Sequence, residues 1–354
     1  MLPFADELQK ALQAFKSGEA DAFISVSDGI SKEELCMKIF YSPSYTIAAH
    51  SFETTRKSGW IAESLAREPI AGIELVAPQP TSATALSRVH DPEYVDAVRT
   101  GNPRELAESQ GFRWDSALWE MACSSNGGVV AAANEALRNR GVSGSLSSGL
   151  HHARRARGAG FCTFNGLVLA AGAALDTGAR TVLILDLDAH CGGGTHELID
   201  GDERIWQMDV SVDVFDGYEP LGNNQLEMVH DSSRYLPTIE RKLTWLEREA
   251  PRFDICLYNA GMDPFGGCSI GAGCRGSRKR FSATVRKPCS HGVGCGTFPS
   301  HSSLRGDTSG RSSTAQGSSR STGSRSKQRA LRMTDAPWLG LSHWKPSTKD
   351  GLVR

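Results

Sequence analysis

The chain has 354 residues, 39% of them hydrophobic, and a formal net charge of −1. This length allows one large domain or two smaller ones, and the near-zero charge gives no general attraction to nucleic acid or to an anionic membrane. No apolar run approaches the roughly 18 residues that span a bilayer, and residues 1–15 lack the apolar core of a signal peptide. Nine cysteines without framework spacing predict reduced thiols and a cytoplasmic location.

Three segments of the chain differ in character. Residues 1–36 hold one short amphipathic pattern, and we expect an N-terminal extension with the natural start at Met37. Residues 37–270 alternate short apolar runs with helical patterns, which predicts one α/β domain. Residues 271–354 are rich in Ser, Gly and Arg without apolar periodicity. They are therefore expected to form a low-complexity tail without stable packing.

Strand and helix patterns alternate along the domain with short links. Strands are expected from Met37, at Gly72–Val76, and at residues 181–188, 203–210 and 254–258. Helices are expected within Ser51–Ala66, after Pro92, from Asp115 through Leu137, at Leu167–Leu175 capped by Asn165, and at Pro237–Glu249, with a flexible loop at Ser143–Gly149. This alternation predicts a mostly parallel sheet covered on both faces.

The stretch from Thr181 to Thr195 is the most informative part of the chain. Val182–Leu185 is a continuous apolar run, typical of a strand buried on both faces. Asp186, Asp188 and His190 follow at intervals of two residues, so alternation places them on one face at the carboxyl end. Open α/β sheets bind their ligands at that end, and the glycines at 192–194 allow the backbone to turn closely there.

Two further groups are expected to join Asp188 and His190. Asp263 follows a later apolar run, and His151-His152 follow the predicted loop. An Asp/His/Asp set provides three ligands and leaves one position open, which is the arrangement of a catalytic zinc rather than a structural one. A neutral histidine beside such a metal can accept a proton from water and return it to a leaving amine. The pattern therefore predicts amide hydrolysis.

Six motifs, in this order, resemble those of the histone deacetylase family, which includes bacterial acetylpolyamine amidohydrolases and acetoin-utilisation proteins. They are Val89-His-Asp-Pro-Glu-Tyr-Val95, Gly149-Leu-His-His-Ala153, Gly160-Phe-Cys-Thr-Phe-Asn165, Asp186-Leu-Asp-Ala-His-Cys-Gly-Gly-Gly-Thr195, Met208-Asp-Val-Ser-Val212 and Asn259-Ala-Gly-Met-Asp263. The resemblance covers roughly Met37 to Gly267. It implies an arginase/deacetylase-like three-layer fold. It also implies zinc-dependent removal of acyl groups, such as acetyl, from lysine-like or polyamine amines in a small-molecule or peptide substrate.

The resemblance also implies roles for individual residues. Zinc would be held by Asp188, His190 and Asp263, with His152 as general base and acid and His151 as its electrostatic partner. Asp186 would orient His151 and help to bind a buried potassium ion. That ion would be shared with Asp188, His190, Ser211 and the carbonyl of Val212. Phe161 would line the channel for the acylated side chain, and Gly160 would contact it through its backbone.

One departure from the family pattern concerns the turn after His190. Members of the family usually have His-Gly-Asn or His-Gly-Asp there, whereas this chain has Cys191-Gly192-Gly193. We therefore expect the carboxylate or amide that supports His152 to be missing at Gly193, which would alter the pKa of the base.

A second departure lies in the last quarter of the chain. The family has a late Gly-Gly-Tyr motif whose tyrosine polarises the scissile carbonyl, but no tyrosine follows Asp263 here. Synonymous codons for residues 276–294, read one frame over, can encode Gly-Ile-Thr-Lys-Glu-Ile-Leu-Arg-Asp-Arg-Glu-Glu-Thr-Val-Phe-Ser-Trp-Gly. With the same offset, residues 299–308 can encode Pro-Ile-Ala-Phe-Val-Leu-Ala-Gly-Gly-Tyr. We infer that the reading frame shifts near Gly271, so that the C-terminal part of the fold is lost and the strand at 254–258 is exposed at an edge.

Two alternatives to an active deacylase remain open on the sequence. The first is a catalytically inactive relic of the same family that binds a metal or an acyl-lysine, which the missing tyrosine favours. The second is an arginase-type ureohydrolase. Those enzymes need Asp-Ala-His-x-Asp for a two-metal centre, and Gly192 stands where the second-metal carboxylate would be.

Overall fold

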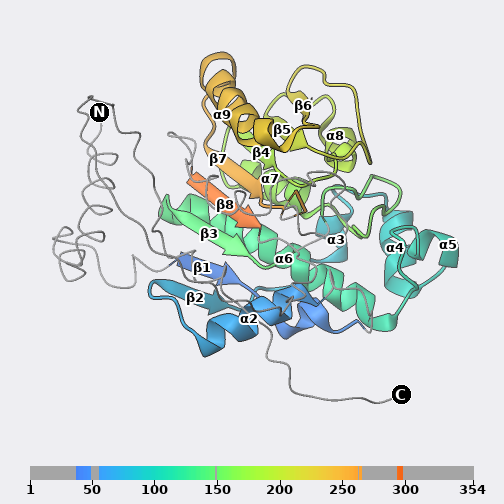
Figure 1. Cartoon of the computed structure of the whole chain (residues 1–354). Coiled ribbons are helices and arrows are strands. Elements are labelled where there is room, and N and C mark those ends of the chain that lie inside the picture. The colour runs from blue at the N-terminus through green and yellow to red at the C-terminus, as the bar shows by residue number, and fades with distance from the viewer. Residues whose placement is uncertain (1–36, 49–55, 148–149, 262, 265–292, 298–354) are drawn as a thin grey trace, which may run out of the picture. The chain divides into compact units, whose positions relative to one another are not determined.

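A computed structural model describes residues 37–48, 56–147, 150–261, 263–264 and 293–297. They form one eight-stranded sheet in the order β2-β1-β3-β8-β7-β4-β5-β6, with every neighbouring pair parallel (Figure 1). The strands are β1 (Met37–Phe40), β2 (Ile73–Val76), β3 (Val142–Ser145), β4 (Val182–Asp186), β5 (Ile205–Ser211), β6 (Asn224–Met228), β7 (Ile255–Asn259) and β8 (Val293–Thr297).

Helices cover both faces of the sheet. They are the 3-10 turn η2 (Pro43–Thr46), α2 (Lys57–Arg67), α3 (Ala83–Leu86), α4 (Pro92–Thr100), α5 (Arg104–Ala107), α6 (Ser116–Asn139), α7 (Gly166–Asp176), α8 (Gly193–Ile199) and α9 (Ser232–Glu249). Residues of α6 and α7 pack on one face, and residues of α9 pack on the other. None of the helices in the described ranges has the length and apolar character needed to cross a bilayer.

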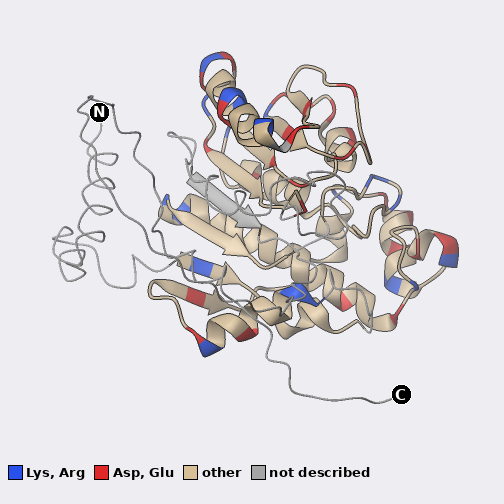
Figure 2. Ribbon diagram, in the orientation of Figure 1, with Lys and Arg blue, Asp and Glu red and all other residues tan. Residues whose placement is uncertain are grey.

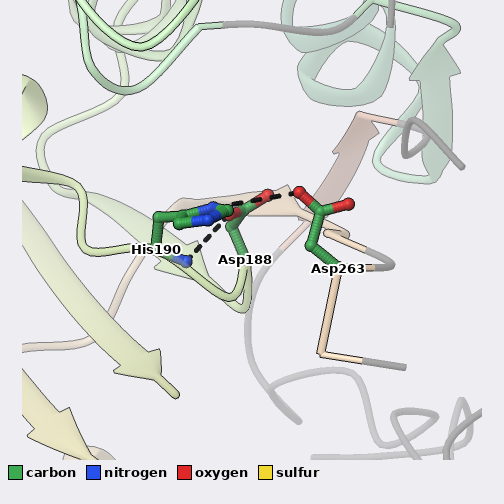
Figure 3. A group of neighbouring side chains, drawn as sticks. All are labelled: Asp188, His190 and Asp263. Carbon is green, nitrogen blue, oxygen red and sulfur yellow. Dashed lines mark hydrogen bonds and ion pairs between the residues drawn. The ribbon is translucent and has the colours of Figure 1, made fainter. Parts of the chain in front are cut away.

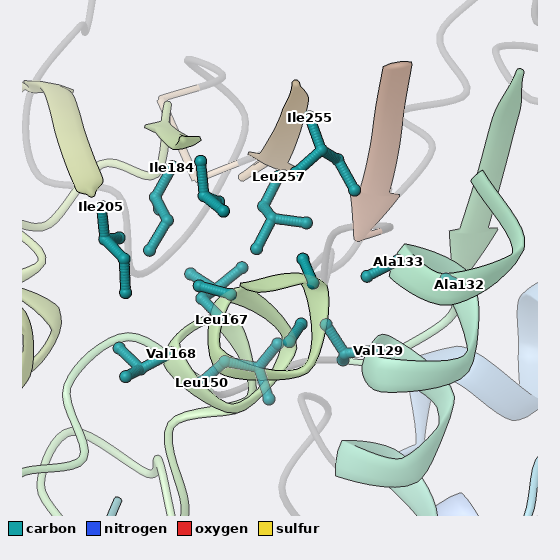
Figure 4. Packing of buried hydrophobic residues seen from close by; sticks show 14 of the residues in the cluster. Val129, Ala132, Ala133, Leu150, Leu167, Val168, Ile184, Ile205, Ile255 and Leu257 are labelled. Atoms are coloured by element: carbon teal, nitrogen blue, oxygen red, sulfur yellow. The ribbon is translucent and has the colours of Figure 1, made fainter. Parts of the chain in front are cut away.

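The strand β4 is buried on both faces because successive side chains point to opposite sides of the sheet. Val182 and Ile184 join the apolar cluster of α6 and α7 (Figure 4). Leu183 and Leu185 join the second cluster, beneath α9. Each fully buried side chain of this size contributes about 1.5–3 kcal/mol to folding. This double burial fixes the position of the residues that follow β4.

Polar residues define where the covering helices begin. Asp115 accepts a hydrogen bond of 2.7 Å from the Ala117 N–H and caps α6, while Asn165 accepts one of 3.1 Å from the Val168 N–H and caps α7. The helix α9 is amphipathic, with Tyr235 packed in the second cluster, and Figure 2 shows both basic and acidic residues along the helix.

The predicted α/β class with a parallel sheet between helical layers is confirmed. Three local predictions were wrong or incomplete. The expected loop at Ser143–Gly149 contains the end of the strand β3, the helix at Pro237–Glu249 begins earlier, at Ser232, and α8 and β6 were not predicted. The strand β3 reads Val-Ser-Gly-Ser, which has no apolar alternation, yet Ser143, Gly144 and Ser145 are buried. Small side chains suit the close approach of α6, and no local pattern reveals that.

The sheet also differs from our expectation of an open edge beside β7. Val293–Thr297 forms β8, which pairs with β7 on one side and with β3 on the other. Backbone groups alone make these ladders, so a segment without an apolar pattern can occupy the position. Without it, two rows of backbone donors and acceptors in the middle of the sheet would be unpaired. Apart from β8, the predicted tail at 271–354 and the extension at 1–36 lie outside the described residues.

His90, from the first of the six motifs, connects the segments that carry the site. Its side chain is 1% exposed. Nδ1 lies 2.8 Å from the carbonyl oxygen of Arg154, and Nε2 accepts a hydrogen bond of 3.0 Å from the Asn165 N–H. The first contact requires a hydrogen on Nδ1 and the second requires a lone pair on Nε2, so the ring is neutral. Burial accordingly lowers the pKa of His90 to about 4.

The tight packing of α6 predicts opposite effects for one substitution at two helical glycines. A methyl group at Gly128 would collide with the hydroxyl of Tyr45, whereas the space around Gly172 is open to 4 Å. Gly128→Ala should lower the free energy of unfolding by about 1–3 kcal/mol through overpacking. Gly172→Ala should raise it by about 0.5–1 kcal/mol through helix propensity. Urea denaturation measures both changes, and equal effects would contradict this account of α6.

His90 also predicts an acid sensitivity. The pKa of its ring is about 4 in the folded chain and about 6.5 when unfolded. The unfolded state therefore binds the proton first, so this contribution is complete above pH 6.5 and is lost as the pH falls toward 4. The advantage of wild type over His90→Gln in free energy of unfolding should shrink by about 2–3 kcal/mol between pH 7 and pH 4.5. A constant difference over that range would show that His90 does not titrate in this way.

Candidate metal centre and histidine pair

The parallel sheet brings three candidate metal ligands to one edge. Asp188 and His190 follow the carboxyl end of β4, and Asp263 follows that of its neighbour β7. Figure 3 shows the three side chains pointing toward one another. One ligand atom from each residue lies within 4.8 Å of the other two. The structure thus brings together the three residues that the sequence analysis selected as zinc ligands.

Distances within this group suit a shared cation. His190 Nδ1 lies 3.0 Å from Asp188 Oδ1 and 3.9 Å from Asp263 Oδ2. The His190 N–H also donates to Asp188 Oδ1, at 3.0 Å, which fixes the turn after β4. A side chain at Gly261 would collide with the backbone of Asp188. Glycine at that position therefore allows the turn after β7 to reach the turn after β4.

The charges of the group are mutually dependent. Burial disfavours the ionised form of Asp188, but the neighbouring His151 and His190 outweigh it and lower the pKa of Asp188 below its usual value. Burial likewise opposes the charge on His190, and Asp188 with Asp263 raises its pKa. A buried carboxylate, a partly buried carboxylate and an imidazole are donors that can bind zinc. The residues present therefore fit a divalent metal.

The histidine pair lies against this group. The rings of His151 and His152 are 3.9 Å apart between centroids, and the ring of His152 is 6.0 Å from that of His190. The Thr195 N–H donates to the carbonyl of His151 at 2.9 Å. A side chain at Gly194 would collide with the backbone of both histidines. The glycine run thus allows the start of α8 to support the pair.

His151 is bonded to a buried carboxylate. Its Nδ1 lies 2.7 Å from Asp186 Oδ2, and its Nε2 lies 3.8 Å from Asp188 Oδ1. Burial opposes a charge on this ring, but Asp186 and Asp188 raise the pKa of His151 to about 10. The ring next to it shows the opposite effect, because burial and then the charge of His151 lower the pKa of His152 to about 4.

His152 is supported by a carboxylate, contrary to our expectation from Gly193. Its Nδ1 lies 2.9 Å from Asp216 Oδ2. Asp216 comes from the loop between β5 and β6, which the motif comparison did not consider. The residue at position 193 shows only that the turn itself supplies no partner. It carries no information about a partner from another segment. The ring instead receives it from a segment 64 residues away.

A second group of polar residues lies beneath the histidine pair. Asp186, Asp209 and Ser211 are fully buried, and Ser211 Oγ donates to Asp209 and to the carbonyl of His190. Asn259 donates to Asp186 Oδ1 at 2.9 Å. Burial, followed by the negative charge of Asp186, raises the pKa of Asp209 well above its usual value. Of the predicted potassium ligands, Val212 adjoins this group, with its N–H bonded to the carbonyl of Ala189 at 2.9 Å.

Two exposed aromatic side chains occur in segments that reach the histidines. Phe161 is 41% exposed and Phe215 is 48% exposed. The ring of Phe215 meets that of His152 edge-on at 5.0 Å, and the ring of Phe161 lies 5.2 Å from that of Phe112. Gly160 has φ of 51°, and a side chain there would collide with the His152 ring. This packing explains why position 160 is a glycine.

Sequence reasoning missed several residues of the site, namely Arg154, Asp209, Phe215, Asp216 and Asn259. Asn259 and Asp209 lay inside quoted motifs and could have been selected as polar residues at the ends of buried strands. Asp216 and Phe215 lie in a loop without a pattern, so their approach to His152 depends on how the chain folds. No local signal in the sequence indicates that contact.

Comparisons with known proteins agree with this geometry. The family described as the histone deacetylase domain matches residues 50–218. An uncharacterized protein of Picosynechococcus sp. is 28% identical over 203 residues, covering 56% of this chain and 67% of that protein. Probable histone deacetylase 1-B of Xenopus laevis is 31% identical over 159 residues, covering 42% of this chain and 32% of that protein. Histone deacetylase 6 of Arabidopsis thaliana is 29% identical over 162 residues, covering 42% of this chain and 34% of that protein.

The chain thus spans about a third of the length of the two eukaryotic relatives. Among solved structures, the crystal structure of the HDA15 HD domain superposes with a TM-score of 0.57 at 20% identity, covering 66% of this chain and 76% of that one. That likeness establishes the shared fold. The family match and the identities to named relatives lead to one conclusion: residues 50–218 of the chain belong to the histone deacetylase family.

Proposed function

We propose that the chain descends from, and retains the core site of, a zinc-dependent amidohydrolase that removes acyl groups such as acetyl from lysine-like or polyamine amines. The observation that carries this proposal is the convergence of Asp188, His190 and Asp263 beside the histidine pair. Three buried cysteines of the described ranges, Cys123, Cys162 and Cys191, form no disulfide, which supports an action in the reducing cytoplasm.

Asp188, His190 and Asp263 would hold the zinc. Zinc with three protein ligands supplies a Lewis acid for the acyl carbonyl and acidifies a water molecule. The chain itself supplies the proton carriers and the surroundings. His151 stays charged next to Asp186 and Asp188, because those carboxylates stabilise the imidazolium.

His152 is the proton carrier in this proposal. It is neutral near pH 7, because burial and the charge of His151 lower its pKa. With the hydrogen of its ring on Nδ1, bonded to Asp216, its Nε2 has a lone pair and can accept a proton. The same nitrogen can then deliver that proton to the nitrogen of the leaving amine.

The approach to the site suits an alkyl chain that ends in an amide. Phe215 presents an exposed apolar ring beside His152, and Phe161 is an exposed ring next to Gly160, where a side chain would meet both His152 and Phe215. The methylene chain of an acylated lysine or polyamine can pack against such rings, while its carbonyl reaches the metal ligands. Both small-molecule and peptide substrates fit this description.

We also propose that a potassium ion binds beneath the histidines. The resemblance assigns it to Asp186, Asp188, His190, Ser211 and Val212. Support comes from the two fully buried carboxylates of Asp186 and Asp209, since a cation beside them would offset their repulsion. Asp209 would then join the residues around the ion.

The inactive relic is the second candidate, and the observation that favours it is the absence of any tyrosine after Asp263. Such a protein would bind the metal, or an acylated amine, without turnover. The ureohydrolase has less support, because among the described residues only one group of at least three metal-ligating side chains occurs.

The zinc site predicts a specific loss of metal. The wild-type chain should bind one zinc per molecule, and His190→Ala should lose most of it because one of three ligands is removed. His196→Ala is the matched control, since His196 stacks on Tyr218 outside the ligand group. Elemental analysis after dialysis measures the content. Equal zinc content in both variants would show that His190 is not a zinc ligand. Two equivalents of bound manganese would favour a ureohydrolase.

The missing tyrosine predicts that this chain is a slow deacylase. Removing one donor to a developing oxyanion typically slows a reaction about 10²–10³-fold. A chain whose frame is restored from codon 271, and which regains Gly-Gly-Tyr, should therefore release acetate about 10²–10³-fold faster from an acetyl-lysine peptide or an acetylpolyamine.

Two controls show whether the restored tyrosine causes the increase in rate. Changing the restored tyrosine to phenylalanine should return the rate to that of the present chain, because the strand is kept and only the donor is lost. His152→Ala should abolish acetate release in every version. Should the present chain match the restored one, the tyrosine is dispensable here. If the restored, zinc-loaded chain releases no acetate from either substrate, the proposed function is wrong.

A further inference from the structure

The carboxylate of Asp216 lies between donors from two other segments. Its Oδ2 lies 2.9 Å from His152 Nδ1 and accepts a hydrogen bond of 3.1 Å from the Gly194 N–H. Its Oδ1 accepts from Arg154 Nη2, and only 7% of the side chain is exposed. Because a carboxylate only accepts, the hydrogen of a neutral His152 ring must be on Nδ1. The contact therefore determines which ring nitrogen has the lone pair.

The backbone conformation at Asp216 suits aspartate better than most side chains. Its φ is 58°, in the left-handed region that glycine adopts freely and that Asp and Asn enter more readily than other residues. Gly217 follows directly, so the loop already contains a residue suited to such a conformation. Residues held in that region tend to occur where the side chain has a task. Here that task is the bond to His152.

The residue that faces Asp216 is Gly193, the first residue of α8. A side chain at Gly193 would collide with both the carbonyl oxygen and the carboxylate of Asp216. The volume that such a side chain would fill is thus taken by the loop. The Asp216 carboxylate can therefore occupy this position only because residue 193 has no side chain.

Arg154 keeps the arrangement together. It follows His152 by two residues, and its Nη1 pairs with Glu197 of α8 at 2.7 Å while its Nη2 pairs with Asp216. Its carbonyl oxygen is held by His90 Nδ1. The loop that carries His152 therefore also carries the cation that fixes the carboxylate beside it. Only 24% of the Arg154 side chain is exposed, so solvent screens this pair weakly.

We propose that Asp216 is the positioning residue of His152, presented by the loop after β5, held by Arg154 and made possible by glycine at 193. It acts through His152 and does not touch the reacting atoms. This inference rests on the proposed role of His152 as the proton carrier. It explains how the chain keeps an oriented base although the turn after His190 lacks a carboxylate or amide.

The test compares Asp216→Asn with Asp213→Asn in the zinc-loaded full chain. Asp213 lies in the same loop, and its Oδ1 accepts from the Phe215 N–H at 2.8 Å, which asparagine can also do. Asp216→Asn should lower kcat for an acetyl-lysine peptide roughly 10–100-fold, with KM and zinc content unchanged, because only proton transfer is affected. Asp213→Asn should stay within about two-fold of wild type.

Nitrogen-15 NMR gives a readout that does not depend on activity. The His152 signals, assigned by their loss in His152→Ala, should show hydrogen on Nδ1 alone in wild type and in Asp213→Asn. Asp216→Asn should show a mixture of the two neutral forms. Gly193→Ala should resemble Asp216→Asn, because the added methyl displaces the loop.

The outcomes separate this inference from the proposed function. If Asp216 only supports the loop, Asp216→Asn lowers zinc content or thermal stability but leaves the His152 signals unchanged, and the inference is overturned. An equal fall in kcat for Asp213→Asn overturns it as well. If the frame-restored, zinc-loaded chain also cleaves no acylated amine, the proposed function fails, and the NMR comparison alone decides whether Asp216 positions the ring.

Discussion

The rest of the site depends on the burial of Asp186 at the carboxyl end of β4. A fully buried carboxylate is stable only if its oxygens are satisfied, and the chain supplies His151 Nδ1 to one oxygen and the side chain of Asn259 to the other. Those partners come from the loop before α7 and from the neighbouring strand β7. Satisfying this carboxylate therefore holds the histidine pair at the edge of the sheet where the metal ligands emerge. The geometry of the candidate site is in this sense a consequence of satisfying the hydrogen bonds of a buried carboxylate.

The same chain of contacts explains why so many glycines surround the site. Gly261 allows the turns after β4 and β7 to meet, Gly194 allows α8 to contact the histidine backbone, and Gly193 makes room for Asp216. Each removes a side chain where two backbone segments approach closely. The candidate metal ligands and His152 come from separate segments, and these contacts bring them close to one another.

The sequence predicts those features of the fold and site that leave a pattern among neighbouring residues. The strand β4 and the helix α9 were found because burial on two faces, or on one, leaves a regular apolar pattern. The convergence of Asp188, His190 and Asp263 could be predicted because parallel topology places strand ends together. By contrast, β3 and β8 are built from Ser- and Gly-rich segments whose pairing uses the backbone, which every sequence has. Asp216 reaches His152 only through tertiary contacts, and no spacing of residues in the sequence predicts that contact.

A damaged C-terminal segment could leave the sheet incomplete or could remove the tyrosine donor, and the strand β8 shows that these two effects are independent. The ladder between β3 and β7 is complete, so the backbone groups of the central strands are paired whatever residues β8 contains. A strand of any sequence can do this, but only a particular side chain can donate to an oxyanion. The fold and the metal ligands can therefore persist while the chemistry is weakened. The difference in rate between the frame-restored chain and its tyrosine-to-phenylalanine variant then reports on the missing donor rather than on an incomplete sheet.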